Sequence, residues 1–202
     1  MNRTSSKGLG YVLKASVWLT VIAALVILAL LVSAIIKYFP MLFEDVDKFS
    51  YPLEYEKEIS AASEEFSVPE EIICAVIYTE SAFNKNACSS VGARGLMQIM
   101  PSTFADIQKA LGTSYTDDDL YDPAVNIRAG TYYLSYLYRL LGDWENVHAA
   151  YNAGIGTVWG WLDDERYSKD GKLTHIPYAE TDNYVKKIET AKVKYAELYF
   201  EK

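Results

Sequence analysis

The stretch SVPEEIICAVIYTES, residues 67–81, decides the fold of this chain. Its apolar positions recur at helical spacing, at Ile72, Ile73, Val76 and Ile77. Ser67 followed three residues later by Glu70 matches a capping box, in which each side chain bonds a free backbone N–H group of the first turn. The stretch therefore predicts a helix that starts after Ser67 and buries one face in the core.

Glu80 lies at the edge of that apolar face, four residues after Val76 and three after Ile77. A carboxyl group that loses water there holds its proton more tightly, so we expect a raised pKa. A carboxyl group protonated near neutral pH can donate its proton to a glycosidic oxygen. The alternative is a solvated residue at a fraying helix end, and the spacing alone does not decide between the two.

The rest of the chain also contains residues that typically start and end helices. We expect helices over residues 53–66, entered at Pro52; from Asp122-Pro123 towards Gly142; from Asp143 through Ala153, ended by Gly154; and from Thr181 to about Phe200. Residues 172–178 are the ambiguous exception, and no other stretch alternates like a strand. The prediction is a mainly α domain over residues 53–202.

Residues 15–36 form an uncharged run of 22 residues between Lys14 and Lys37. A helix of that length spans about 33 Å, enough to cross a bilayer. Residues 1–14 carry only basic charges, whereas acidic residues follow the run, so the positive-inside rule places residues 1–14 in the cytoplasm. The alternative is a cleaved signal peptide, for which Val32-Ser33-Ala34 is a weak cleavage site.

Residues 37–52 become polar and acidic and contain Pro40 and Pro52, which predicts a short extracytoplasmic stalk. Residues 37–202 carry 16 Lys and Arg against 27 Asp and Glu, a formal net charge of −11. An acidic surface of this kind excludes nucleic acid as the expected partner. An anionic polymer would have to be recognised in a local groove.

Metal and thiol chemistry find little support in the sequence. The two histidines, His148 and His175, lie far apart in the sequence, so we expect no metal and no cofactor. Cys74 lies in an apolar run, and although an oxidising compartment permits a bridge to Cys88, we expect free or buried thiols. A cysteine peptidase built on Cys88 stays conceivable, but neither histidine is marked as its base.

The stretch GARGLMQIMP, residues 92–101, is too rich in glycine to start a helix and too apolar for a plain solvated loop. It suits a groove wall that approaches a ligand, with a buried turn as the alternative. The glycines of residues 154–160 have the wrong spacing for a dinucleotide loop and indicate a helix end and turn. Beside them, Trp159 and Trp161 suit either sugar stacking or core packing.

Four motifs together resemble the goose-lysozyme-like lytic transglycosylases of the soluble lytic murein transglycosylase type. They are ESAFN at residues 80–84, SSVGARGLMQIMP at 89–101, AAYNAG at 149–154 and IPYAETDNYV at 176–185. They stand in the family's order and the resemblance covers roughly residues 54–200. The chain departs from the pattern at Cys88, where the family usually has an apolar residue.

The resemblance implies a lysozyme-like α-helical fold with a sugar-binding cleft and Glu80 as the sole catalytic carboxyl. Glu80 would protonate the bond between N-acetylmuramic acid and N-acetylglucosamine. It would then act as base on the C6 hydroxyl, whose attack leaves a 1,6-anhydro end. An internal nucleophile needs no second carboxylate to activate water.

The resemblance also assigns roles to residues around Glu80. Ser81 and Gln98 would hydrogen-bond near the scissile bond, and Met97 would pack on a sugar. Tyr151 and Asn152 would hold substrate or orient Glu80. Glu180 would line the cleft, and Tyr184 is a further candidate for substrate binding.

These expectations describe a single-pass membrane protein whose catalytic domain, residues 53–202, cleaves the glycan strands of peptidoglycan outside the cytoplasm. Proteins of an envelope or secretion machine are its conceivable partners. Two alternatives from other classes stay open. In a goose-type lysozyme, water would replace the C6 hydroxyl. In a non-catalytic glycan-binding scaffold, Glu80 would be dispensable.

Overall fold

The computed structural model describes residues 5–201, and for residues 5–16 and 40–45 it describes the backbone alone. The chain divides into two compact units, residues 1–49 and 50–202. The basic flank that predicted the orientation, at Arg3, Lys7 and Lys14, lies outside the residues described with side chains.

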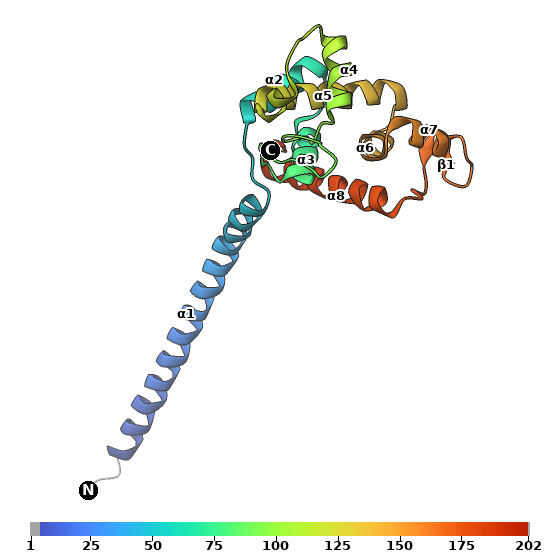
Figure 1. Ribbon diagram of the computed structural model, residues 1–202. Helices are drawn as coiled ribbons and strands as arrows, with labels where there is room; N and C mark the ends of the chain where they lie inside the picture. The colour runs from blue at the N-terminus through green and yellow to red at the C-terminus, as the bar shows by residue number, and fades with distance from the viewer. Residues whose placement is uncertain (1–4, 202) are drawn as a thin grey trace. The chain divides into compact units, whose positions relative to one another are not determined.

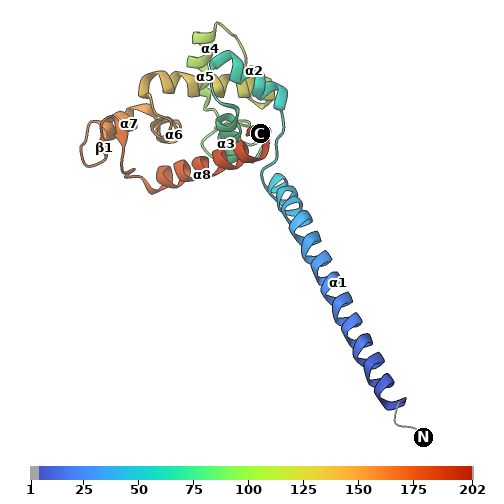
Figure 2. The same ribbon diagram turned by 180° about the vertical axis from the view of Figure 1, so that it is seen from behind.

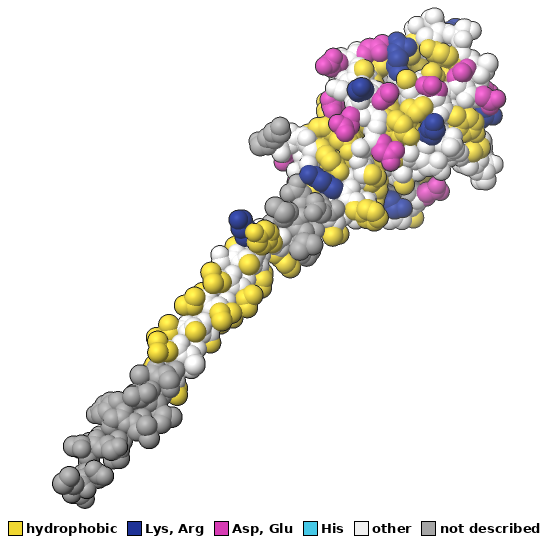
Figure 3. Space-filling view, turned by 90° about the vertical axis from the view of Figure 1, so that its left-hand side faces the viewer, with side chains coloured by type: hydrophobic (Ala, Val, Ile, Leu, Met, Phe, Trp, Pro, Cys, Tyr) yellow, Lys and Arg dark blue, Asp and Glu magenta, His cyan; other side chains and the backbone are white. Residues whose placement is uncertain are grey.

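The first unit is the long helix α1, Ser5–Ser50. Its stretch Val17–Phe39 is long and apolar enough to cross a membrane and has no buried residue. Figure 3 shows apolar side chains along this part of the helix. Residues 37–50 of the expected stalk continue α1, so Pro40 does not end the helix. Pro52 disfavours helical backbone at Tyr51, where the helix has ended.

The second unit is mainly α, as predicted (Figure 1). Its elements in order are α2 Glu56–Phe66, α3 Glu70–Ser81, α4 Pro101–Leu111, the 3-10 helix η1 Asp117–Tyr121, α5 Pro123–Leu141, α6 Trp144–Ala153, α7 Ile155–Leu162, β1 Ser168–Lys169, β2 Lys172–Leu173, α8 Ala179–Tyr195 and the π-helical turn η2 Ala196–Phe200. The two strands pair antiparallel, with Ser168 opposite Leu173. They form a small hairpin between α7 and α8.

Helix α3 is the centre of the core. All six residues from Ile72 to Ile77 are buried, which explains why this stretch is apolar on more than one face. Helix α8 packs along α3 and also against α6, and both ribbon views show α3 and α8 side by side (Figure 1 and Figure 2). Because α8 touches α3 and α6, residues far apart in the sequence meet near the C-terminal end of α3.

The helix boundaries follow the sequence signals at α5 and α6. The carboxylate of Asp122 accepts hydrogen bonds from the N–H groups of Ala124 and Val125, and Asp143 caps α6 in the same way. Gly142 ends α5 with a left-handed backbone conformation, φ 64°. Glycine adopts this conformation without steric cost. The predicted starts of α5 and α6 and the predicted end of α5 are confirmed.

The capping box at the start of α3 is wrong. Pro69 precedes the first helical residue, Glu70, and no side chain caps this end. Ser67 is instead the left-handed residue that ends α2, and the Glu70 carboxylate accepts a hydrogen bond of 3.0 Å from Ser60. Ser67 and Glu70 therefore do not form the expected box, because Ser67 ends α2 and Glu70 is already the first residue of α3.

Gly154 ends α6 as expected, but the turn expected over the residues that follow it is wrong. Gly154 separates α6 from a further helix, α7, of which Val158 and Trp161 are buried. Trp161 fills the core, whereas 47% of Trp159 is exposed. Cys74 is buried and Cys88 exposed, and both thiols are free, as expected.

Candidate active site

Glu80 lies in the last turn of α3, where the helix leaves the core. The hydroxyl of Tyr184, from α8, donates a hydrogen bond of 2.6 Å to Glu80 Oε1. Burial raises the pKa of Glu80 to about 7, and the Tyr184 hydrogen bond opposes part of that rise. A carboxyl group with this pKa is protonated in a large fraction of molecules near neutral pH and can also act as a base.

Ser81 ties the end of α3 to the glycine-rich loop. Its hydroxyl lies 2.8 Å from the carbonyl oxygen of Leu96 and 3.1 Å from that of Ile77, and its one proton can be donated to either. The chain then turns sharply at Ala82 and Phe83, which both have positive φ. Ser81 thus holds the loop beside Glu80, whereas its expected hydrogen bond near a scissile bond stays a prediction.

The loop between α3 and α4 folds back on itself through single bridges that pair Arg94 with Cys88 and with Ile99. Gln98 lies on its turn, with φ 46°, and its amide donates to the carbonyl oxygens of Ala87 and Gly95. The loop is therefore braced from within by a residue that was expected to bind substrate. Contact of Gln98 with a ligand stays a prediction.

Asn126, which the sequence analysis missed, anchors this loop from α5. Its Oδ1 accepts a hydrogen bond of 2.8 Å from the N–H of Met97. Its Nδ2 donates to the carbonyl oxygens of Arg94 and Leu120, at 3.0 and 2.8 Å. A Cβ on Gly95 would lie only 2.1 Å from the Leu120 oxygen, so glycine is required there. In the sequence, Asn126 could have been recognised as a polar residue on the buried face of a predicted helix.

The expectation that Met97 packs on a sugar is wrong, since its side chain has no exposed surface in this structure. Its sulfur occupies the space beside Gly130, where an added Cβ would lie 2.3 Å away. Met97 contributes through its backbone instead, because its carbonyl oxygen accepts a hydrogen bond of 2.8 Å from the Tyr151 hydroxyl. Met100, at the start of α4, is the partly exposed methionine of this motif.

Tyr151 and Asn152 end α6 beside the loop and α8. Burial raises the pKa of Tyr151 well above its usual value, and the charge of Glu80 adds to the effect, so the two side chains are close enough to interact. Asn152 Oδ1 accepts a hydrogen bond of 2.8 Å from the hydroxyl of Thr181, a residue the sequence analysis also missed. The Thr181 bond joins the end of α6 to the first turn of α8.

Glu180 is exposed in the first turn of α8. It lies one helical turn before Tyr184, and residues four apart share a helix face. It therefore lies on the side of α8 that reaches Glu80, towards solvent. Its lining of a cleft stays a prediction.

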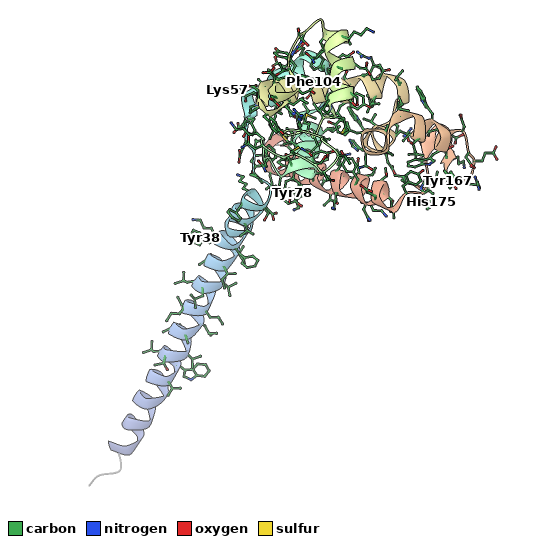
Figure 4. All side chains as sticks on the ribbon, viewed as in Figure 1. Tyr38, Lys57, Tyr78, Phe104, Tyr167 and His175 are labelled. Atoms are coloured by element: carbon green, nitrogen blue, oxygen red, sulfur yellow. The ribbon has the colours of Figure 1, made fainter. Side chains whose placement is uncertain are left out.

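The groups that a metal enzyme or cysteine peptidase would need are separate in this structure. Among the described residues, no three His, Cys, Asp or Glu side chains come together as metal ligands. His148 is fully buried, with Nδ1 3.1 Å from Glu189 Oε1. His175 lies beside Tyr167 near the hairpin, where both are labelled in Figure 4. Their ring centroids are 6.0 Å apart. Burial raises the pKa of the Cys74 thiol, which disfavours a thiolate.

Comparison with known proteins gives one consistent family. Residues 57–174 match the family described as the transglycosylase SLT domain. The chain is 37% identical over 143 residues to the soluble lytic murein transglycosylase of Escherichia coli strain K12, and 35% identical over the same length to that of Salmonella typhimurium. Each alignment covers 68% of this chain and 22% of the relative.

Solved structures agree with the sequence comparison. The 70 kDa soluble lytic transglycosylase Slt70 of Escherichia coli superposes with a TM-score of 0.71 at 33% identity, over 77% of this chain and 26% of that one. An inactive mutant of the lytic transglycosylase Slt from Pseudomonas aeruginosa superposes with a TM-score of 0.69 at 33% identity, over 74% and 25%. The chain thus spans about a quarter of the length of these relatives.

Proposed function

Because the chain belongs to the transglycosylase SLT domain family, we propose that it is a peptidoglycan lytic transglycosylase with Glu80 as catalytic acid and base. The observation that carries the proposal is the protonation equilibrium of Glu80 near neutral pH. Its pKa is raised to about 7 by burial, and the Tyr184 hydroxyl donates a hydrogen bond to it from α8. One carboxyl group that both donates and accepts a proton near neutral pH suits a single-carboxyl mechanism.

In the first step, protonated Glu80 donates its proton to the oxygen that joins C1 of N-acetylmuramic acid to C4 of N-acetylglucosamine, and the C1–O bond breaks. In the second step, the Glu80 carboxylate accepts the proton of the C6 hydroxyl while O6 attacks C1. The C1–O6 bond forms a 1,6-anhydro ring, and Glu80 is again protonated. No water is consumed, so no second carboxylate is required.

The remaining residues of the site would prepare these steps. Tyr184 fixes one oxygen of Glu80, so Oε2 is the oxygen on which we place the transferred proton. Ser81 and Tyr151 hold the glycine-rich loop through the carbonyl oxygens of Leu96 and Met97. We place Gln98, Asn152 and Glu180 at the sugar-binding surface around them.

Helix α1 supports a proposal on location. The stretch Val17–Phe39 would anchor the protein in the membrane, with residues 1–14 in the cytoplasm and the catalytic domain outside. Proteins of an envelope or secretion machine would be the partners that use the cleavage. A reporter enzyme fused after Lys202 should be active only when it lies outside the cytoplasm, and activity in the cytoplasm alone would refute this orientation.

The activity is tested by mass spectrometry of the fragments that the full chain releases from purified murein. A lytic transglycosylase leaves 1,6-anhydro-muramic ends, and the Glu80→Gln variant should release almost none. Reducing ends in place of anhydro ends would identify a lysozyme. Glycan binding without any cleavage by the parent protein would identify a non-catalytic scaffold.

A further inference from the structure

A buried histidine that the proposed mechanism does not use makes a second polar contact between α6 and α8. His148 lies one helical turn before Asn152 on α6, and its side chain has no exposed surface. Its Nδ1 lies 3.1 Å from Oε1 of Glu189, on α8. Its Nε2 has no hydrogen-bond partner among the residues that the structure describes. A polar contact of this ring thus joins α6 to the helix that carries Tyr184.

The buried imidazole needs a reason to be there. Burying a ring nitrogen without a partner costs free energy that a leucine of similar volume would not cost. What a polar contact can add to a core is a defined position, because a nitrogen and a carboxylate oxygen meet at one alignment of their two helices. Glu189 is held in turn by a hydrogen bond from Lys192, also on α8. The carboxylate that His148 meets is therefore itself fixed in place.

Two contacts with α6 lie on either side of Tyr184 along α8, which passes α6 in both ribbon views (Figure 1 and Figure 2). Thr181 donates to Asn152 Oδ1 before it, and Glu189 contacts His148 after it. Thr181 and Glu189 are eight positions apart, about 12 Å along the helix axis. The hydrogen bond of 2.6 Å from Tyr184 to Glu80 would exceed the usual range of O–H···O bonds after a displacement of about 1 Å. The position of α8 therefore decides whether this bond forms.

We infer that His148 and Glu189 are positioning residues of the active site, whose contact aligns α8 with α6 so that the Tyr184 hydroxyl reaches Glu80. The inference rests on the proposed function for the role of Glu80. It adds two residues that touch neither the substrate nor the reacting atoms and that act through Tyr184.

The test changes His148→Leu, which keeps much of the volume and removes the polar contact. The full chain in detergent is assayed on purified soluble muropeptides, as the pH dependence of kcat/KM. Because the Tyr184 hydrogen bond lowers the pKa of Glu80, its weakening should move the alkaline decline of activity to higher pH. The value at the optimum should fall by up to about 10-fold, the scale of one lost hydrogen bond to a charged group.

A double variant separates positioning from a general effect on the protein. In a Tyr184→Phe background, His148→Leu should move the alkaline decline no further, because the hydroxyl that it positions is absent. Asn146→Ala is the matched control, since Asn146 is equally buried on α6 but bonds the backbone of residues 171 and 173 in the hairpin. It should lower stability without moving the decline, and a shift equal to that of His148→Leu would overturn the inference.

Glu189→Ala removes the same contact from the other helix, at a side chain that is 38% exposed and so better able to tolerate replacement. It should move the alkaline decline in the same direction. An unmoved decline in Glu189→Ala, or a further shift by His148→Leu when Tyr184 is already phenylalanine, would show that apolar packing alone positions α8.

The positioning role can also be measured without substrate, by carbon-13 NMR titration of the Glu80 carboxyl group, assigned by its absence in Glu80→Gln. The pKa of Glu80 should rise in Glu189→Ala, since burial and the Tyr184 hydrogen bond are what shift it. A parent protein that releases no anhydro ends, but whose Glu80 titration moves in Glu189→Ala, would refute the proposed function and leave the positioning role intact. A parent protein that releases anhydro ends, but whose Glu80 titration stays unmoved in Glu189→Ala, would overturn the positioning role alone.

Discussion

The hydroxyl of Tyr184 donates a hydrogen bond of 2.6 Å to Glu80 Oε1, joining two residues that are 104 positions apart. The bond and burial shift the pKa of Glu80 in opposite directions. Burial favours the neutral carboxyl group, whereas a hydrogen-bond donor favours the carboxylate. The balance leaves the pKa of Glu80 at about 7. Tyr184 therefore both orients the carboxyl group and keeps its proton labile enough to leave.

Changing Glu80→Gln should reduce the release of anhydro-muropeptides by at least about 100-fold, the low end for general acid–base catalysis. Glutamine keeps the volume of glutamate but cannot transfer the proton. Quantitative mass spectrometry of released fragments measures the effect. If a well-folded Glu80→Gln protein cleaves at nearly the parent rate, the catalytic acid has to be sought elsewhere, first at Glu180.

The same substitution should stabilise the protein at alkaline pH. The pKa of Glu80 is about 7 in the folded state against 4.5 as its ordinary value. The unfolded chain therefore loses this proton first, and the parent loses stability as pH rises from about 4.5 to 7. Well above pH 7 the cost is on the order of 3 kcal/mol, and glutamine does not incur it. Urea unfolding at pH 5 and pH 8 should show a gain for Glu80→Gln that grows with pH, and a gain equal at both pH values would contradict the raised pKa.

Changing Tyr184→Phe should raise the pKa of Glu80 further, because the hydrogen bond that lowers it is lost. The decline of activity at alkaline pH should then move to higher pH. The rate at the optimum should fall by about 10-fold, the scale of one lost hydrogen bond to a charged group. The pH dependence of kcat/KM measures both effects.

Tyr195→Phe is the matched control for this prediction. Its hydroxyl donates to the carbonyl oxygen of Pro52, at 2.9 Å, and not to Glu80. This variant should lose stability without moving the alkaline decline. An equal shift in both variants would mean that Tyr184 does not act through Glu80.

The position of the candidate catalytic residue could be predicted from the sequence, but the contacts around it could not. Helical spacing placed Glu80 at the edge of a buried face, and the structure agrees. The Tyr184 bond depends on the packing of α8 against α3, which no local pattern encodes. Met97 was misassigned because a methionine in a glycine-rich motif suits a ligand and a core equally well, and only the place of Gly130 decides between them.

Asn126 offers a test of how far the loop depends on one anchor. Changing Asn126→Ala removes three hydrogen bonds to the backbone of residues 94, 97 and 120. Each buried backbone group left without a partner costs about 1–3 kcal/mol, so the loop should lose its position beside Glu80. We expect a fall in activity of more than 10-fold in protein that is still folded, measured under conditions where circular dichroism shows native structure.

Asn146→Ala is the control, because Asn146 is equally buried and braces the hairpin instead. It donates to the carbonyl oxygen of Gly171 and accepts from the N–H of Leu173. Its loss should lower stability by a similar amount and leave the rate of the folded fraction nearly unchanged. Equal activity losses in the two variants would show that stability alone accounts for the effect of Asn126.

Glu189 and Glu145 should have opposite effects on the dependence of stability on pH. The contact of Glu189 with His148 Nδ1, at 3.1 Å, followed by the hydrogen bond from Lys192, lowers the pKa of Glu189 to about 2. Burial and then the charge of Asp143 raise the pKa of Glu145. A depressed folded-state pKa contributes stability that is present above the ordinary value and is lost as pH falls towards 2. A raised one costs stability once the unfolded chain ionises.

Relative to the parent, Glu189→Gln should therefore become less stable as pH rises from about 2 to 4.5, since the parent alone gains from ionisation there. Glu145→Gln should become more stable relative to the parent as pH rises above about 4.5. Urea unfolding of the three proteins at pH 3, 5 and 7, followed by near-ultraviolet circular dichroism, measures both trends. Glu189 of α8 contacts His148 of α6, and these helices carry Tyr184 and Tyr151. A Glu189→Gln protein that matches the parent at every pH would show that this contact does not hold the two helices together.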